Sequence, residues 1–199
     1  MSDSLPDVIE VCFVPRAGCH RARDRIVAST LGTEPERLRW RISRYGRPEL
    51  IGAGGVDCNL SHTGPLAAIA VARGRRVGVD VETVRRDTPV GALAARFFPA
   101  DQASYVGEDP GRFYRLWTRK EACVKAIGGK LAQSLALPVL TTGAVSTSTG
   151  ALAGRRWFVV DVPAPGGGVL ASVAAVGPRP FAVRVKQSGI PLEDDDDRI

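Results

Sequence analysis

The stretch from Phe113 to Lys130 reads FYRLWTRKEACVKAIGGK, and the rest of the chain is interpreted around it. Its apolar residues recur at three- and four-residue spacing, which predicts an amphipathic helix. Gly128 and Gly129 then supply the left-handed conformation that ends such a helix. Lys120 falls inside the apolar arc, while Glu121 and Lys125 lie one turn apart along its edge. The helix therefore places three charged groups at the boundary of the core, where a charge needs a partner.

These charged residues allow two interpretations. In the first, Glu121 and Lys125 form an ion pair between residues i and i+4, and Lys120 extends its ammonium group into water. In the second, they belong to a site completed by carboxylates elsewhere in the chain. Arg115 and Arg119 are expected on the opposite, exposed face of the helix.

The composition is typical of a globular protein of one domain or two small ones, with 199 residues, 44% hydrophobic and 24% charged. The net charge of +6 suits a polyanionic ligand or an acidic partner. No nucleic-acid-binding motif accompanies the scattered arginines, so nucleic acid is not an expected partner.

The lack of a recognisable targeting signal and the pattern of cysteines favour a cytoplasmic location. The start, MSDSLPDVIE, is acidic and polar, unlike a signal peptide, and no apolar run reaches membrane-spanning length. The four cysteines form no CxxC pair, which favours reduced thiols over a zinc site.

Hydrophobic patterns and breaker residues predict alternating strands and helices. Helices are expected at 21–31, 92–97 and 113–127, and strands at 8–14, 38–43, 66–71, 77–82, 157–162, 169–176 and 181–186. The strands at 66–71 and 77–82 are expected to form one hairpin, and those at 157–162 and 169–176 another. Irregular segments are expected at 59–64, 133–140 (extended) and 141–154 (flexible), and the acidic tail around 193–197 is expected to be disordered.

Two carboxylates share one face of the strand VGVDVE. The valines take the other face, so Asp80 and Glu82 lie about 6–7 Å apart. At an effective dielectric constant near 20, two such charges repel by about 2–3 kcal/mol. Water would relieve this repulsion on an exposed face, and a hard cation such as Mg²⁺ would relieve it at a site. Glu121 could supply a third oxygen from the helix.

A set of basic residues suits a ligand with several phosphates. His62 lies in a Ser-His-Thr-Gly segment, where Ser61 could also donate to a phosphate, although a surface histidine is the simpler interpretation. The other members of the set are Arg21, Arg47 and Lys125. Phosphate-binding residues beside a magnesium cluster indicate chemistry on a pyrophosphate.

Three motifs, SHTG at 61–64, GVDVE at 78–82 and FYRLWTRKEACVKAIGGKL at 113–131, resemble those of the 4′-phosphopantetheinyl transferases in order and spacing. The similarity is to the Sfp-type branch and extends from about His20 to Lys186. Tyr45-Gly46-Arg47-Pro48 resembles a further element of that family. The chain before His20 is short, so some of the family's basic residues for the 3′-phosphate of coenzyme A have no counterpart, with Arg16 or Arg23 as possible substitutes.

The resemblance implies an α+β fold of two similar halves related by a pseudo-twofold axis. The halves are expected at residues 1–87 and 88–187, followed by a tail at 188–199. It also implies that a monomer binds coenzyme A between the halves and transfers the phosphopantetheine arm to a serine of an acyl or peptidyl carrier protein. Such carriers serve fatty-acid, polyketide and peptide synthases.

The resemblance and the residue patterns together suggest roles at the site. The expected Mg²⁺ ligands are Asp80, Glu82 and Glu121; Glu121 also acts as general base, and Lys125 stabilises or protonates the departing 3′,5′-ADP. The residues expected to bind coenzyme A are Arg21, Arg47, Pro48, Ser61, His62 and Lys125. The alternative is a module that binds coenzyme A or a carrier without catalysis.

Overall fold

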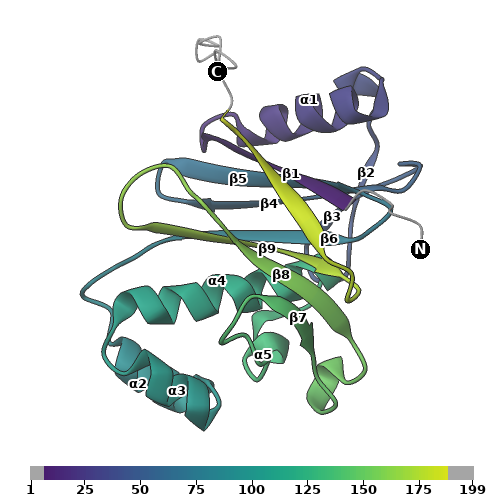
Figure 1. The fold of residues 1–199 in the computed structure, drawn as a ribbon. Helices are drawn as coiled ribbons and strands as arrows, with labels where there is room; N and C mark the ends of the chain where they lie inside the picture. The colour runs from purple at the N-terminus through teal and green to yellow at the C-terminus, as the bar shows by residue number, and fades with distance from the viewer. Residues whose placement is uncertain (1–6, 188–199) are drawn as a thin grey trace.

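The chain folds into four layers, with two four-stranded sheets enclosed between helix α1 and a group of helices led by α4 (Figure 1). The computed structural model describes residues 7–187. This arrangement confirms the expected α+β class. The predicted acidic tail lies outside the described residues.

The first half of the chain contributes one helix and five strands. Their bounds are β1 (Asp7–Pro15), α1 (Cys19–Leu31), β2 (Trp40–Ile42), β3 (Pro48–Leu50), β4 (Val56–Thr63) and β5 (Leu66–Arg73), with a 3₁₀ turn at Pro35–Arg37. The remaining elements are β6 (Val77–Thr83), α2 (Val90–Phe97), α3 (Ala100–Val106), α4 (Pro110–Ile127), α5 (Leu131–Ser134), β7 (Gly143–Ser146), a 3₁₀ turn at Gly150–Leu152, β8 (Arg156–Val162), β9 (Val169–Val176) and β10 (Phe181–Gln187).

Three strands of each large sheet follow one order, and the fourth strand is added at opposite ends of the two sheets. The first sheet runs β10-β1-β5-β4 and the second β6-β9-β8-β7, so each contains a β-α-β-β unit whose first strand pairs with its last. Strand β6 is antiparallel to β9, and β5 pairs with β1 and β4. The predicted hairpin between 66–71 and 77–82 is therefore wrong, because the chain crosses from one sheet to the other between these strands. The pseudo-twofold relation itself stays a prediction.

Strand pairing crosses the expected boundary between residues 87 and 88. Strand β6 lies before it but belongs to the second sheet, while β10 lies after it and pairs in parallel with β1. The division into halves at 87/88 stays a prediction, and the sheets themselves exchange one strand across it.

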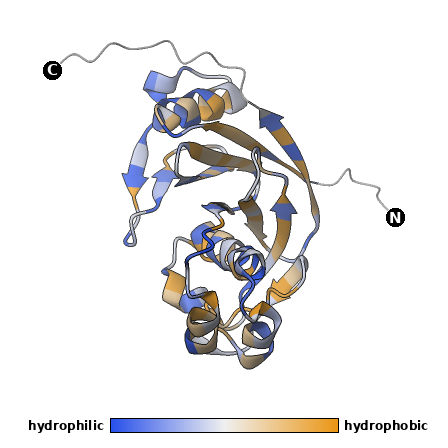
Figure 2. Cartoon of the chain, turned by 90° about the vertical axis from the view of Figure 1, so that its left-hand side faces the viewer, coloured by the Kyte–Doolittle hydropathy of each residue, from blue (hydrophilic) through white to orange (hydrophobic). Residues whose placement is uncertain are grey.

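The sheets pack face to face through small and branched apolar side chains. Val77, Val79 and Val81 of β6 are buried in this layer together with alanines of β5 and β9. Figure 2 shows the hydrophobic colouring concentrated on the strands between the helical layers. The alternation predicted for VGVDVE is therefore confirmed, and Asp80 and Glu82 face α4 rather than the sheet interface.

A ladder of polar side chains joins the edge strands β4 and β6. Alternate residues of β4 accept hydrogen bonds from backbone N–H groups at the free edge of β6. The pairs are Asp57 with Val77 N (2.8 Å), Asn59 with Val79 N (2.9 Å) and Thr63 with Thr83 N (3.0 Å). The predicted loop at 59–64 is thus wrong: most of it is strand, and its polar residues satisfy an edge that no strand covers.

Three further segments differ from the expectation. Helix α3 was not predicted, α5 replaces the start of the extended segment at 133–140, and β7 forms within the segment expected to be flexible. Each is a short element whose stability comes from packing against α4 or β8 rather than from its own pattern.

Gly78 lets α4 approach β6 closely, and a side chain there is expected to displace the helix. A Cβ atom at this position would lie 2.1 Å from the carbonyl oxygen of Ala122 and 2.4 Å from the amide nitrogen of Ala126. We expect Gly78→Ala to lower the free energy of unfolding by about 3 kcal/mol, as overpacking does. Urea denaturation measures this change. Gly167→Ala is the control, because nothing lies within 4 Å of its Cβ position, and equal stability of the two variants would contradict the prediction.

Candidate active site

Asp80, Ser61 and Lys125 meet where β6, β4 and α4 come together. The Lys125 ammonium donates to Asp80 Oδ1 at 2.6 Å and to Ser61 Oγ at 3.0 Å, and Ser61 Oγ donates to the same carboxylate oxygen at 2.9 Å. Lys125 thus pairs with Asp80 rather than with Glu121, the partner in the first of the two interpretations of the helix. Three elements distant in sequence therefore converge on one carboxylate.

Ser61 departs from the ladder formed by its neighbours on β4. Asp57, Asn59 and Thr63 each accept from a backbone N–H of β6, whereas Ser61 bonds to the side chains of Asp80 and Lys125. Its hydroxyl is buried, so it holds the lysine and the carboxylate in position. The alternation of polar residues at 57, 59, 61 and 63 is the signal by which the sequence could have revealed this strand.

The second oxygen of Asp80 has no partner among the described residues. Asp80 is 2% exposed, and its Oδ2 atom is buried without a hydrogen bond. A buried anionic oxygen in this state is costly unless a cation or donor reaches it. One oxygen of Asp80 is therefore satisfied by the protein, and the other is left available to a ligand.

Glu82 and Glu121 lie near enough to Asp80 for its charge to affect their pKa values. Burial, followed by repulsion from Asp80, raises the pKa of Glu82 to about 7, although Lys125 and Arg85 oppose this. Burial also raises the pKa of Glu121, where Lys125 opposes the shift and Asp80 adds to it. One ammonium group does not balance three partly buried carboxylates, so the cluster favours an additional cation.

The donor chemistry of this cluster fits Mg²⁺, which binds carboxylate oxygens and retains several waters. The partnerless Asp80 Oδ2 is the observation that supports the fit. Within residues 7–187, no three histidine, cysteine, aspartate or glutamate side chains are already grouped as a metal site. Glu82 and Glu121 would therefore move toward the ion, and their role as ligands stays a prediction.

The raised pKa of Glu82 predicts a pH-dependent loss of stability in the metal-free protein. Its folded pKa of about 7 lies above the ordinary value of 4.5. The protonated carboxyl therefore stabilises the folded state at low pH, and this stabilisation is lost as the pH rises from about 4.5 through about 7. In EDTA, we expect Glu82→Gln to raise Tm relative to wild type much more at about pH 8 than at about pH 5. Thermal melts at both pH values measure the difference. The exposed Glu34→Gln serves as control, and an equal gain at both pH values would contradict the assignment.

Lys120 is a buried structural cation rather than an exposed one. It is 0% exposed, and its ammonium donates to the carbonyl oxygens of Leu135 (2.6 Å) and Leu137 (2.8 Å). It also lies 4.8 Å from the centre of the Phe98 ring. Burial lowers the pKa of Lys120 to about 7. The interpretation in which Lys120 extends into water is wrong, because the segment after α5 has carbonyl groups that need a donor.

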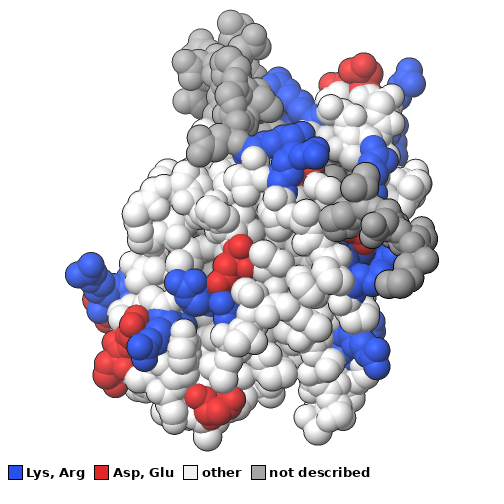
Figure 3. Space-filling model, viewed as in Figure 1, with Lys and Arg blue, Asp and Glu red and all other residues white. Residues whose placement is uncertain are grey.

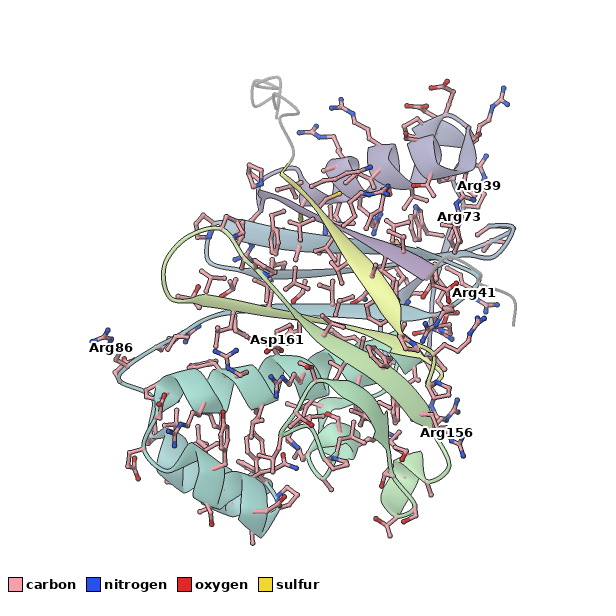
Figure 4. The ribbon with its side chains drawn as sticks, viewed as in Figure 1. Arg39, Arg41, Arg73, Arg86, Arg156 and Asp161 are labelled. Atoms are coloured by element: carbon pink, nitrogen blue, oxygen red, sulfur yellow. The ribbon has the colours of Figure 1, made fainter. Side chains whose placement is uncertain are left out.

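Arg119 is also buried, contrary to the expected exposed face. Its guanidinium forms two hydrogen bonds with Asp161, at 2.8 and 2.7 Å, and donates to the carbonyls of Val139 and Leu140. Figure 4 places Asp161 between β8 and α4. Arg115 keeps its expected outward position and adds a 3.2 Å contact to Asp161. The segment at 135–140 is thus held to α4 by buried cations, which the apolar periodicity alone did not reveal.

Arg47 is buried and held by hydrogen bonds inside the protein. It is 6% exposed and donates to Asp57 Oδ2 (2.6 Å), to the carbonyls of Cys58 and Val77, and to the carbonyl of Lys125. It therefore ties the β2–β3 hairpin to the end of α4. Its predicted contact with coenzyme A stays a prediction.

The other residues expected to bind coenzyme A lie around this centre. His62 is exposed at the end of β4, Arg21 is exposed on the first turns of α1, and Pro48 is half-buried at the start of β3. Of the two suggested substitutes for the 3′-phosphate, Arg23 bonds to Asp24 and lies 4.1 Å over the Trp40 ring, whereas Arg16 is exposed. All four cysteines are free thiols, as expected, and are buried.

Comparison with known proteins identifies the family to which this chain belongs. The family model of the 4′-phosphopantetheinyl transferase superfamily matches residues 76–160, which contain β6 and α4. The 4′-phosphopantetheinyl transferase AcpT of Salmonella typhi is 34% identical over 153 residues, covering 72% of this chain and 77% of AcpT. The chain therefore belongs to the 4′-phosphopantetheinyl transferase superfamily.

Two other relatives match over a shorter stretch. The transferase HetI of Nostoc sp. is 34% identical over 116 residues, and a 4′-phosphopantetheinyl transferase of Bacillus subtilis is 29% identical over 117 residues. In both cases the match spans about half the relative, 49% of its length. Membership of the Sfp-type branch stays a prediction. No helix among residues 7–187 is long and apolar enough to cross a membrane.

Proposed function

We propose that the protein transfers the 4′-phosphopantetheine arm of coenzyme A to a serine of an apo acyl or peptidyl carrier protein and releases 3′,5′-ADP. The observation that carries the proposal is the convergence of Ser61 and Lys125 on the carboxylate of Asp80, whose second oxygen is buried without a partner. The relatives AcpT and HetI, both named 4′-phosphopantetheinyl transferases, support the same reaction class.

The residues of the site have separate roles in this reaction. Glu121 takes the proton of the carrier serine, whose oxygen forms a bond to the phosphorus that bears the pantetheine arm. The bond from that phosphorus to the bridging oxygen breaks, and 3′,5′-ADP departs. Lys125, held by Asp80 and Ser61, stabilises or protonates the departing phosphate. The raised pKa of Glu121 brings it nearer to the working range of a general base.

Asp80, Glu82 and Glu121 would hold Mg²⁺ beside the pyrophosphate. When bound, the ion supplies positive charge that offsets the charge developing on the phosphates. His62 and Arg21 bind the phosphate groups of the nucleotide, and Pro48 contacts another part of coenzyme A. Ser61 and Arg47 act mainly by position, because the Ser61 hydroxyl and the two terminal nitrogens of the Arg47 guanidinium already bond within the protein.

The proposed partner is an acidic carrier protein met by a cytoplasmic monomer. A net charge of +6 would speed the encounter of the two proteins. Figure 3 shows the lysines and arginines of one face in separate groups, with acidic side chains between them. This pattern suits local pairing with acidic residues of the carrier better than tracking along a nucleic acid.

Intact-mass measurement of a panel of apo carrier proteins tests the proposal. After incubation with the protein, coenzyme A and Mg²⁺, at least one fatty-acid, polyketide or peptide carrier should gain a single phosphopantetheine arm. EDTA should stop the transfer, and so should replacement of the carrier serine by alanine. If coenzyme A binds but no carrier gains the arm, the protein is a binding module rather than a transferase.

A further inference from the structure

The chain joins a cationic body to one strongly acidic segment, EDDDD at residues 193–197, here called the acidic segment. Residues 188–199 contain these five acids and one arginine, so they carry a net charge of −4. The whole chain carries +6, and residues 1–187 therefore carry +10. Two such charges on one chain attract each other, most strongly where the cations are exposed.

The register of the first sheet shows that the chain leaves β10 close to the candidate active site. Gln187 pairs with Phe13 of β1, which also pairs with Ala68 of β5. Ala68 pairs in turn with Ser61 of β4. These residues form one row across four strands, so Gln187 and Ser61 lie about 14 Å apart, three strand spacings of about 4.8 Å. Figure 1 shows this end of β10 beside the start of α1.

The acidic segment is close enough along the chain to reach the site. Residue 193 follows Gln187 by six residues, and an extended chain spans at most about 3.3–3.6 Å per residue. Six residues therefore reach about 20 Å, which exceeds the distance across the sheet. The cations of β10 itself, Arg184 and Lys186, already pair with Glu10. The acidic segment can thus extend past them to the next cations.

Four exposed basic side chains at this end of the sheet form a surface here called the basic corner. Its members are Arg16, His20, Arg21 and His62. Arg16 directly follows β1, and its carbonyl accepts a hydrogen bond from the amide of Cys19 (3.2 Å), the first residue of α1. His20 and Arg21 therefore lie in the next turn of the chain. The first turn of α1 contains no acidic residue that would offset their charge.

His62 completes the basic corner from β4. It directly follows Ser61, the member of the row that belongs to the candidate site. Cys58 and Leu60, on the same face of β4 as His62, pack beneath α1, so His62 faces that helix. The basic corner thus borders both the site and the end of β10.

Carboxylates and phosphates bind the same donors. The N–H groups of guanidinium and imidazole donate to the anionic oxygens of either. A run of aspartates therefore resembles the phosphates of coenzyme A, which the proposed function assigns to Arg21 and His62. Tethering gives the acidic segment an effective concentration of about millimolar, so weak contacts are enough to populate the pairing. Pairing through charge needs no regular secondary structure.

We infer that the acidic segment pairs with the basic corner when coenzyme A is absent, and that coenzyme A displaces it on binding. The inference rests on the proposed function and adds a regulation of the same site. An internal anion that must leave first lowers the apparent affinity for coenzyme A. Because both contacts are ionic and exposed, this effect is large at low salt and disappears at high salt.

NMR spectra of the histidine rings test the contact without coenzyme A. The chain has two histidines, His20 and His62, and both belong to the basic corner. The tail-neutral variant carries Asp194→Asn, Asp195→Asn, Asp196→Asn and Asp197→Asn. At about 0.02 M salt, the ring signals of this variant should differ from those of wild type. At about 0.5 M they should coincide, because charges are then screened within about 5 Å.

Calorimetric titration with coenzyme A measures the competition. At about 0.02 M salt, the tail-neutral variant should have a Kd about fivefold lower than wild type, and at about 0.5 M the two values should agree. A synthetic peptide of residues 190–199, added at about millimolar concentration, should raise the Kd of the tail-neutral variant and restore the wild-type histidine signals. The same peptide with asparagine in place of its aspartates should do neither.

A second variant controls for the change in net charge. The body-neutral variant removes four exposed acids outside the basic corner, with Glu34→Gln, Glu36→Gln, Asp101→Asn and Glu108→Gln. Both variants therefore raise the net charge by the same amount. The body-neutral variant should keep the histidine signals of wild type, and its Kd for coenzyme A should stay within about twofold of wild type.

Three results would overturn the inference. The first is coincidence of the histidine signals of wild type and the tail-neutral variant at low salt. The second is an equal gain in affinity for coenzyme A in the body-neutral variant. The third is a change in the histidine signals with no change in Kd, which would mean that the segment binds without competing. If no form of the protein binds coenzyme A, the proposed function fails, while the histidine signals still decide whether the acidic segment contacts the basic corner.

Discussion

Asp80→Ala is expected to lower kcat/KM by about 10³-fold. The change removes the oxygen that holds Ser61 and Lys125 as well as the buried oxygen left for a cation. Added Mg²⁺ should restore activity only in part, because a carboxylate ligand is missing. Initial rates of carrier modification, measured over a range of Mg²⁺ concentrations, check this expectation.

Asp80→Asn separates the two functions of this carboxylate. The amide keeps an oxygen that can accept from Lys125 and Ser61, but it lacks the negative charge. We expect its activity to lie between wild type and Asp80→Ala, with a greater demand for Mg²⁺. Near-normal turnover of Asp80→Ala at low Mg²⁺ would remove Asp80 from the metal site, and Asp101→Ala, which alters an exposed acid, is the control.

Lys125→Met is expected to lower kcat by about 10²–10⁴-fold, with a much smaller effect on the Kd of coenzyme A. The ammonium is held by Asp80 and Ser61 beside the carboxylates, where it can act on the departing phosphate. Methionine keeps the length and apolar stem of the side chain but cannot donate a proton. Single-turnover rates and calorimetric Kd values separate the two effects.

Lys120→Met is the matched control on the same helix. Lys120 donates to two buried carbonyls outside the carboxylate cluster, so its loss should lower Tm while the folded fraction keeps a kcat near wild type. If Lys125→Met instead abolished binding of coenzyme A with kcat preserved, Lys125 would be a binding residue only.

The helix with the strongest pattern was predictable from the sequence. The apolar periodicity from Phe113 to Ile127 and the glycine pair that follows gave the course of α4 and its end, where Gly128 adopts the left-handed conformation. The alternation in VGVDVE likewise gave the faces of β6. Both patterns are local, since they depend on which side chains are apolar within one element.

Pairing between elements was not predictable in the same way. The segment at Val77–Thr83 has the same pattern whether its partner is β5 or β9, and only the crossing between sheets decides it. Polar residues on β4 suggested a loop because their partners are backbone groups of a strand some 20 residues later. Side-chain partners that lie far along the chain leave no periodic signal.

The same distinction between local patterns and partners far along the chain applies to the site residues. The sequence indicated Asp80, Glu82, Glu121 and Lys125 as a charged cluster, but it did not indicate that Lys125 pairs with Asp80. It also did not reveal that Arg119 and Arg47 are buried. A buried arginine among carbonyl groups has the same sequence appearance as an exposed one, because its partners belong to other elements.

The parallel pairing of β1 with β10 has a consequence for the order in which the molecule can assemble. Register from Asp7 with Phe181 to Phe13 with Gln187 means that one edge of β1 stays open until the ribosome has released the last of these residues. Glu10 also awaits its partners Arg184 and Lys186. An open strand edge is a template for pairing with other chains. The nascent chain is thus vulnerable to aggregation for most of its synthesis, and shielding by a chaperone would matter most before β10 emerges.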